Sequence, residues 1–214
     1  ARPTAEMAYG ACASATSWGI DEGNVGAGAG CTVGKVLGPG RSMKGGFGVG
    51  IAGSPAAQQV MAAAFVVVNA FGHVRGPDGT IIAGPRSDDG RLLDTERLIA
   101  GGGVDAGGGV DAGGGGASTT IAVVALNVAL TKVALQQVAR AASAAYARRI
   151  GPSGSSFDGD VIFAVSPLEG RPASLLQAEV CATAALEEAI VSAVRRAKGR
   201  EGIPGLADDH PSHK

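Results

Sequence analysis

Residues 118–127 read STTIAVVALN and directly follow a stretch, 101–116, that reads GGGVDAGGGVDAGGGG. The first segment is rich in β-branched residues and predicts a buried strand over Thr119–Leu126. The glycine repeat has almost no side chain to bury and loses much backbone entropy on ordering, so it predicts an exposed linker. A flexible segment therefore meets a rigid strand at Ser118/Thr119.

The segments on either side of this strand also have regular patterns. Amphipathic helices are predicted over Thr131–Arg149, with Thr131 as the N-cap, and over Pro172–Ala197. A short helix is predicted over Thr4–Ala15. Strands that can pair antiparallel are predicted over Lys44–Ile51, Met61–Asn69 continued past a kink by Phe71–Val74, Thr80–Ala83 and Asp160–Val165. Long strands and two packed helices predict an α+β layered architecture.

Composition limits the classes of function. The chain has 214 residues, 36 of them glycine, and 18 Lys+Arg against 19 Asp+Glu give a net charge of -1. A near-zero charge gives no electrostatic reason to expect nucleic acid or an anionic membrane as partner. The longest apolar run, around Met61–Val68, is far shorter than the roughly 20 residues of a membrane helix.

Three cysteines, Cys12, Cys31 and Cys181, have no metal-ligand spacing, and no secretion signal is visible at the start of the chain. We therefore expect reduced thiols and a cytoplasmic protein. No cofactor and no metal is predicted.

The segment Gly26–Lys35, GAGAGCTVGK, looks like a phosphate-binding loop. A P-loop needs glycine where this chain has Ala29 and a hydroxyl where it has Val36. The other interpretation is a tight glycine-rich turn that packs backbone closely and brings Lys35 to a specific place. A nucleotide-binding protein, with phosphate affinity that depends on Lys35, stays open as a further alternative.

Histidine chemistry has little support in the sequence. His210 and His213 lie in an expected tail, and His73, after a strand, is interpreted as a satisfied edge residue rather than a base. An α-amine can instead activate a hydroxyl, because its pKa is near 8 in model peptides. Such a site needs a cut before Thr or Ser where flexible chain meets a rigid strand, as at Ser118/Thr119. A strand that simply begins with Thr after a glycine loop is the alternative.

Four separated segments of the chain have a familiar pattern when taken together: EGNVGAGAGCTVGKVLGPGRSMKGGFG at Glu22–Gly48, VVVNAFGHV at Val66–Val74, STTIAVVALN at Ser118–Asn127 and FDGDVIFAVS at Phe157–Ser166. Together they resemble the DmpA-like family of L-aminopeptidase/D-esterases, β-peptidyl aminopeptidases and nylon-oligomer hydrolases. The resemblance extends over about Arg2–Ala197. The TTI and DGD motifs are more similar to the threonine-type, nylon-oligomer-hydrolase branch than to the serine-type aminopeptidases.

The resemblance implies a single domain with the αββα four-layer sandwich of an N-terminal-nucleophile hydrolase. Relatives carry a further N-terminal segment, which this chain is expected to lack. A precursor would cut itself into an α part, 1–118, that ends in the linker 101–118, and a β part, 119–214, that ends in a flexible tail, 199–214. It also implies a homo-oligomer, a tetramer or larger.

Site residues follow from the resemblance position by position. Thr119 would be the nucleophile and its freed amine the general base, Asn69 would donate to the oxyanion, and Lys35 would support the nucleophile. Asp158 and Asp160 would hold the new ammonium group. Two carboxylates that flank one residue at a strand entrance point the same way, although a plain turn before a strand has the same pattern.

The leading hypothesis is therefore a self-processing amide hydrolase, either an aminopeptidase or an oligoamide hydrolase, that forms an acyl-enzyme on Thr119. Its substrates would be small peptides, amides or oligoamides. The alternative is an uncut, catalytically inactive relative with a structural or binding role.

Overall fold

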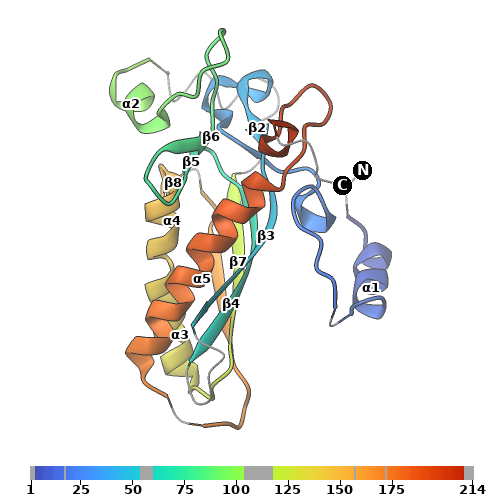
Figure 1. Ribbon diagram of the computed structural model, residues 1–214, viewed down its shortest axis with the longest axis vertical. Coiled ribbons are helices and arrows are strands. Elements are labelled where there is room, and N and C mark those ends of the chain that lie inside the picture. The colour runs from blue at the N-terminus through green and yellow to red at the C-terminus, as the bar shows by residue number, and fades with distance from the viewer. Residues whose placement is uncertain are drawn as a thin grey trace.

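The computed structural model describes residues 3–16, 18–53, 60–103, 118–156, 158–171 and 173–209 (Figure 1). Most of the glycine linker, residues 104–117, lies outside the described residues, as do His210 and His213. Within the described part, no helix has the length and apolar character needed to cross a membrane.

A four-stranded sheet forms the centre of the molecule. Its order is β3 (Gly46–Gly53), β4 (Met61–Asn69), β7 (Thr119–Leu126) and β9 (Val161–Val165). The strands predicted over residues 61–69 and 119–126 are confirmed with the same bounds. β3, β4 and β7 pair antiparallel, whereas β7 and β9 are parallel. Parallel pairing requires a crossover, and helices supply it here.

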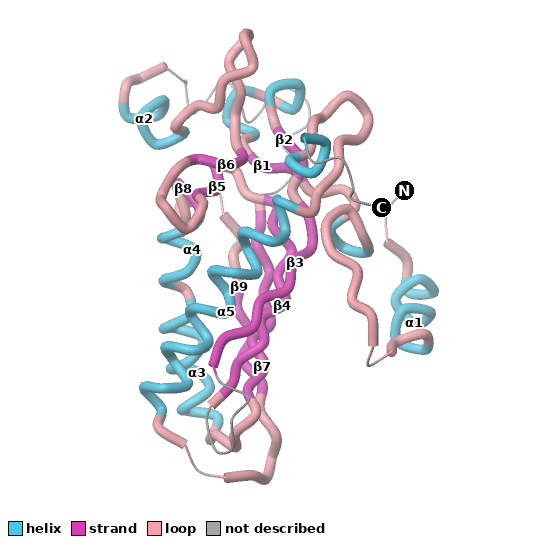
Figure 2. Tube along the Cα trace, viewed as in Figure 1, coloured by secondary structure: helices cyan, strands magenta, loops and turns pink. Residues whose placement is uncertain are grey.

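Three helices cover one face of this sheet (Figures 1 and 2). They are α3 (Lys132–Ala142), α4 (Ala144–Arg149) and α5 (Leu175–Arg195); α5 packs on β3 and β4, and α3 contacts β9. The α+β prediction is confirmed, and the described residues form a helix layer and a sheet layer of the expected sandwich.

The helix predicted over residues 131–149 is two helices, so that prediction was wrong in its extent. The Thr131 hydroxyl accepts from the Ala134 N–H and caps α3 as expected. The break falls at Ser143, whose hydroxyl donates to the Arg140 carbonyl at 2.7 Å. Such local side-chain bonds compete with the helical ladder.

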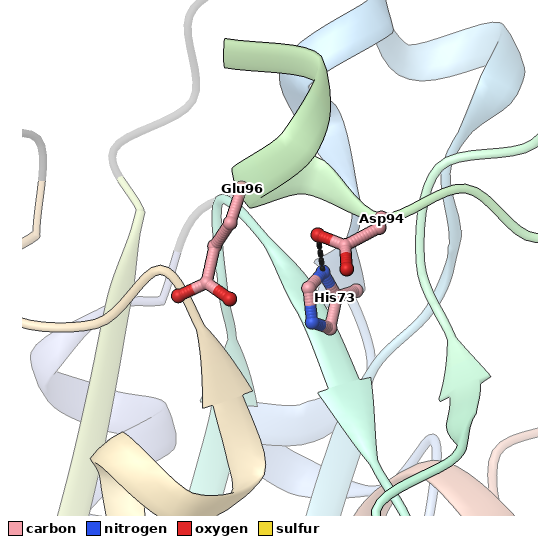
Figure 3. Close-up of side chains that lie close together, drawn as sticks. All are labelled: His73, Asp94 and Glu96. Atoms are coloured by element: carbon pink, nitrogen blue, oxygen red, sulfur yellow. Dashed lines mark ion pairs between the residues drawn. The ribbon is translucent and has the colours of Figure 1, made fainter. Parts of the chain in front are cut away.

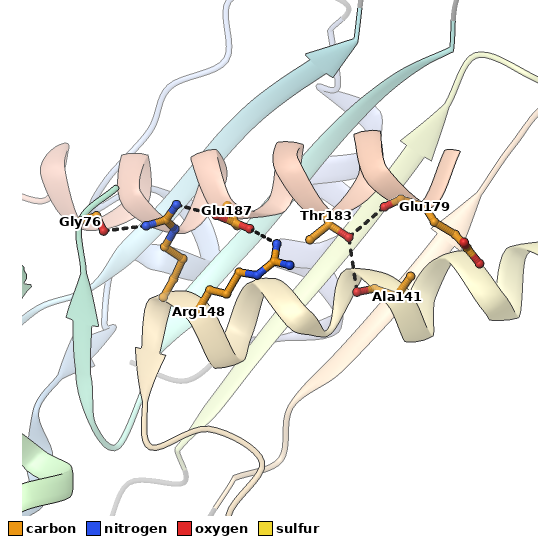
Figure 4. Close-up of polar contacts among 7 residues, drawn as sticks. Gly76, Ala141, Arg148, Glu179, Thr183 and Glu187 are labelled. Atoms are coloured by element: carbon orange, nitrogen blue, oxygen red, sulfur yellow. Dashed lines mark hydrogen bonds and ion pairs between the residues drawn. The ribbon is translucent and has the colours of Figure 1, made fainter. Parts of the chain in front are cut away.

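Polar contacts join α3 and α4 to α5 (Figure 4). The Thr183 hydroxyl on α5 donates to the Ala141 carbonyl at 3.3 Å. One carboxylate on α5, that of Glu187, accepts from both Arg148 and Arg149 of α4. These contacts hold the crossover helices against the helix that packs on the sheet.

The two faces of the sheet differ in burial. Beneath the helices, Ala64, Val66 and Val124 are fully buried. On the opposite face, Ile51 and Phe163 are 58% and 54% exposed. This alternation follows the two-residue period of a strand, so the described residues leave one apolar sheet face uncovered.

Glycines on β3 let α5 approach the sheet. A Cβ on Gly48 would lie 2.2 Å from the Ala189 carbonyl oxygen and 2.5 Å from the Ala193 nitrogen, both backbone atoms of α5. Backbone atoms cannot move aside as a flexible side chain can. The small residues predicted on this strand therefore set the helix–sheet distance.

Gly48→Ala is expected to lower the free energy of unfolding by about 3 kcal/mol, because the helix must move away from the sheet. Urea unfolding measures the change. Gly40→Ala is the matched control, since a Cβ there meets nothing within 4 Å. Equal unfolding midpoints for the two variants would contradict this account of the packing.

A smaller three-stranded sheet has the order β6 (Ile81–Ala83), β5 (His73–Arg75) and β8 (Ile150–Gly151). The prediction that residues 71–74 continue β4 was therefore wrong. At Gly72 a Cβ would lie only 2.0 Å from the Gly151 carbonyl oxygen, so the chain leaves β4 and passes close to β8.

The remaining elements are short. They are α1 (Ala5–Ala13), α2 (Thr95–Ala100), strands β1 (Thr32–Val33) and β2 (Met43–Lys44), and the 3-10 helices η1 (Gly26–Gly28), η2 (Lys35–Leu37), η3 (Pro39–Arg41) and η4 (Leu206–Asp209). In the expected tail, the Pro204 carbonyl accepts from the Lys44 N–H at 2.8 Å, and Leu206 packs against the core.

Candidate active site

The ends of three neighbouring strands bring predicted site residues together at one end of the large sheet. Asn69, the last residue of β4, pairs with Thr119, the first residue of β7. Ser118 forms a parallel bridge with Asp158, just before β9. Directly paired residues on antiparallel strands place their side chains on the same face. The Asn69 and Thr119 side chains therefore share a face, which is the one opposite the helices.

Asn69 is fixed by contacts from the glycine-rich segment. Its side-chain oxygen accepts from the Thr32 N–H at 3.2 Å. Its carbonyl accepts from the Lys35 ammonium group at 2.8 Å. Because the amide oxygen is bonded to backbone, the orientation of the amide group, and of its NH₂ donor, is set before any substrate arrives.

Lys35 reaches Asn69 from a turn that requires glycine. Gly34 has φ 76, a left-handed conformation, and a Cβ there would lie 2.1 Å from the Pro85 nitrogen. Burial lowers the pKa of Lys35 to about 8, with Cys31 and Asp158 acting in the opposite direction. A large fraction of this amine is consequently neutral in mildly alkaline solution, and a neutral amine can accept a proton.

The two carboxylates of the DGD motif have different partners. The Asp160 carboxylate accepts from the Thr120 N–H at 2.6 Å, next to the predicted nucleophile. The Asp158 carboxylate accepts from both the backbone N–H and the hydroxyl of Ser155, at 2.9 and 2.8 Å. Burial raises the pKa of Asp160, and the nearby Asp158 charge adds to the rise. Asp160 is thus a stronger base than an exposed carboxylate.

Two further residues at this end of the sheet were not predicted from the sequence to belong to the site. Gly159 donates its N–H to the Ser118 carbonyl at 3.0 Å. The buried Tyr146 hydroxyl lies 3.2 Å from the Thr120 carbonyl and 3.3 Å from the Val161 carbonyl, so it joins β7 to β9. Gly159 stands between the two predicted aspartates, whereas the helical pattern around Tyr146 marks only a core position.

The glycine-rich segment packs against the sheet. A Cβ on Gly28 would lie 2.3 Å from the Phe47 nitrogen on β3. The Lys35 amine at its end is bonded to the Asn69 carbonyl. These contacts agree with the interpretation of a tight turn that delivers Lys35 to the strand ends.

A second polar cluster lies at α2, away from the strand ends. His73, Asp94 and Glu96 place potential metal-ligating atoms within 4.8 Å of one another (Figure 3). The interpretation of His73 as a satisfied edge residue was wrong, because it is fully buried on the central strand of the small sheet and its Nε2 has no hydrogen-bond partner among the described residues.

Apart from His73 Nε2, the polar groups of this cluster already have protein partners. His73 Nδ1 accepts from the Thr95 N–H at 3.0 Å, Asp94 caps α2, and Glu96 pairs with Arg75. Burial lowers the pKa of His73, with Arg75 adding to the effect, so the imidazole is neutral at pH 7. The cluster joins α2 to β5.

Comparison with known proteins identifies the family. The model of peptidase family S58 matches residues 1–207. The chain belongs to this family. Uncharacterized aminopeptidases of Mycobacterium bovis and Mycobacterium tuberculosis are each 34% identical to it over 231 residues. These alignments cover 98% of the chain and 62% of each relative. The S58 chain therefore spans less than two thirds of the relatives' length, and the family predicted from sequence is confirmed.

Solved structures agree on the fold. The L-aminopeptidase D-Ala-esterase/amidase of Ochrobactrum anthropi, described as a variant of the Ntn hydrolase fold, superposes with a TM-score of 0.56 at 22% identity. That alignment covers 87% of the S58 chain and 49% of the other. A β-aminopeptidase of Burkholderia sp. gives 0.59 at 21% identity, over 95% and 56% of the two chains. The S58 chain thus shares the Ntn hydrolase fold over its own length.

Proposed function

We propose that this S58 chain is part of a self-processing amide hydrolase in which Thr119 is the nucleophile. The main support is that the required chemical groups lie together at one end of the large sheet. Thr119 pairs with Asn69, and the carbonyl of Asn69 accepts from Lys35. Asp160 accepts from the N–H of the residue that follows Thr119. A hydroxyl, an amine that can act as its base and a candidate oxyanion donor are the groups that acyl transfer uses, and the carboxylate can hold the ammonium group that the cut creates.

Self-processing begins with attack of the Thr119 hydroxyl oxygen on the Ser118 carbonyl carbon. The hydroxyl proton passes to the neutral Lys35 amine, which then transfers it to the Thr119 nitrogen as the bond between Ser118 C and Thr119 N breaks. An ester now joins Ser118 to the Thr119 oxygen. Water hydrolyses it and leaves a Ser118 carboxylate and a free amine on Thr119.

Hydrolysis of a substrate repeats the same chemistry. The Thr119 hydroxyl attacks the substrate amide, and its own amine, now free, accepts the proton and passes it to the leaving nitrogen. The Asn69 side-chain NH₂ donates to the tetrahedral oxyanion. The acyl-enzyme on Thr119 is then hydrolysed by water. When the Thr119 amine carries the proton, Asp158 and Asp160 hold the resulting ammonium group in place beside the reacting atoms.

Substrates of this class are amides and peptides with a free amino terminus. The relatives are named aminopeptidases, and the two similar structures are an L-aminopeptidase D-Ala-esterase/amidase and a β-aminopeptidase, which supports this choice. Release of amine from simple aminoacyl amides tests it. No release by the purified and matured protein, across α- and β-aminoacyl amides, would favour the alternative of a structural or binding relative.

The location and assembly of the protein are further parts of the proposal. Cys12, Cys31 and Cys181 are all unpaired, which supports a reducing, cytoplasmic location. Assembly into a homo-oligomer rests on the resemblance to the DmpA-like family. Light scattering on purified protein measures the oligomeric state directly, and a monomer would remove this part.

The pKa of Lys35 makes self-processing dependent on pH. The neutral fraction of the amine grows as the pH rises through about 8, so the rate of self-cleavage is expected to rise through the same range and then level off. Lys35→Arg, which stays protonated, should cut slowly and lose this inflection. The rate is measured from the loss of uncut chain by mass spectrometry at a series of pH values. A flat profile for the wild type would contradict the role of Lys35 as base.

A further inference from the structure

The geometry points to the backbone N–H of Gly159 as the oxyanion donor of the self-cleavage step. This inference rests on the proposed function and adds a catalytic group to it. The N–H of Gly159 donates to the Ser118 carbonyl at 3.0 Å, and that oxygen is the one that becomes negative when Thr119 attacks. No side-chain motion is needed to form this contact, so the donor is preorganised.

Gly159 also lies against the attacking atom. A Cβ on this residue would lie 2.8 Å from the Thr119 hydroxyl oxygen and 3.6 Å from its methyl carbon. The backbone of Gly159 does not have the left-handed φ that favours glycine, so an added side chain is opposed by the nucleophile rather than by backbone strain. Gly159 therefore lies against both reacting groups. Its Cα faces the Thr119 hydroxyl, and its N–H donates to the Ser118 carbonyl.

The hydrogen bond from the Gly159 N–H to the Ser118 carbonyl can also be interpreted as the last hydrogen bond of the β7–β9 ladder. The parallel bridge between Ser118 and Asp158 extends that ladder by one position. A rung that serves only the sheet stabilises the folded chain but does not change the rate at which the folded precursor cuts itself. An oxyanion donor bonds more strongly in the transition state than in the ground state, so its removal slows the reaction itself.

The two interpretations predict different rates of self-cleavage when the N–H of Gly159 is replaced without changing the shape of the residue. Glycolic acid at position 159 substitutes an ester for the amide and removes the donor. The matched control is the same substitution at Gly170, in the connection between β9 and α5. Self-cleavage of full-length protein is followed by intact mass, and thermal unfolding of both ester proteins is measured in a Thr119→Ala background that cannot cut itself.

The expected result is self-cleavage about 100-fold slower for the ester at position 159 and unchanged for the ester at Gly170. A wild-type rate at position 159, with only a lower unfolding temperature, overturns the inference and leaves the proposed function intact. Failure of the wild type to cut at all overturns the proposed function itself. The two failures are therefore distinguishable.

A second variant covers the case in which the ester protein does not fold. Gly159→Ala keeps the N–H and places a methyl group against the Thr119 hydroxyl, so self-cleavage should slow at least about tenfold through misplacement of the nucleophile. Gly170→Ala is the control, because a Cβ there makes ordinary contacts with Ala129 at 3.4 and 3.5 Å. Equal rates of self-cleavage in the two alanine variants overturn the placement of Gly159 against the Thr119 hydroxyl, and with it the geometry on which the inference rests.

Discussion

Replacing Thr119 with alanine is expected to leave one uncut chain of 214 residues and to abolish amide hydrolysis. The change removes the only atom that the proposal allows to attack either the Ser118 carbonyl or a substrate. Loss of a nucleophile costs about 10⁴-fold or more in rate. Mass spectrometry and the release of amine from an aminoacyl amide measure the two effects.

Thr119→Ser is the informative companion to this variant. Serine keeps the hydroxyl and loses only a methyl group, so cutting and hydrolysis should both persist. Cutting at the Ser118 carbonyl in the alanine variant would contradict the proposal, because no oxygen would be present on residue 119 to carry it out. Loss of activity in the serine variant, with the fold retained, would indicate that the methyl group positions the nucleophile.

Replacing Asn69 with aspartate is expected to lower the rate of substrate hydrolysis by about 10²–10³-fold. Aspartate keeps an oxygen that can accept from the Thr32 N–H, as the amide oxygen of Asn69 does at 3.2 Å. It removes the NH₂ donor and places a negative charge near the oxyanion. The loss should therefore appear in kcat while the fold persists, and steady-state kinetics on an aminoacyl amide measure it.

The chain offers a matched control at the opposite end of the same strand pair. The side-chain oxygen of Asn127 accepts from the Met61 N–H at 2.8 Å, in a contact of the same type. Asn127→Asp makes the same chemical change far from Thr119 and should leave kcat within about twofold of the wild-type value. If both variants lose the same activity, the effect of Asn69→Asp is structural and the oxyanion role is wrong.

Strong local patterns in the sequence predicted the large sheet well. β4 and β7 begin and end as predicted, and β7 is a run rich in β-branched residues between Ser118 and Asn127, which favour turns. The chain path after β4 was not predicted, since it depends on the close approach of Gly72 to Gly151, which are far apart in sequence. Tertiary contacts of this kind leave no periodic signal.

The candidate site likewise contains some residues that the sequence predicted and one that it did not. The resemblance implied one site for Thr119, Asn69 and Lys35. The strand register pairs Thr119 with Asn69, and the Lys35 amine donates to the Asn69 carbonyl. Gly159 was not predicted because its contribution is a backbone N–H, which every non-proline residue carries. Only the geometry reveals which carbonyl that N–H meets.

The most direct test of the central claim is the intact mass and N-terminal sequence of freshly purified wild-type protein. The proposal predicts two chains that meet between residues 118 and 119, the second beginning TTIAVVAL. A single chain with residue 119 still bonded to residue 118, or fragments that meet only at another bond, would contradict it.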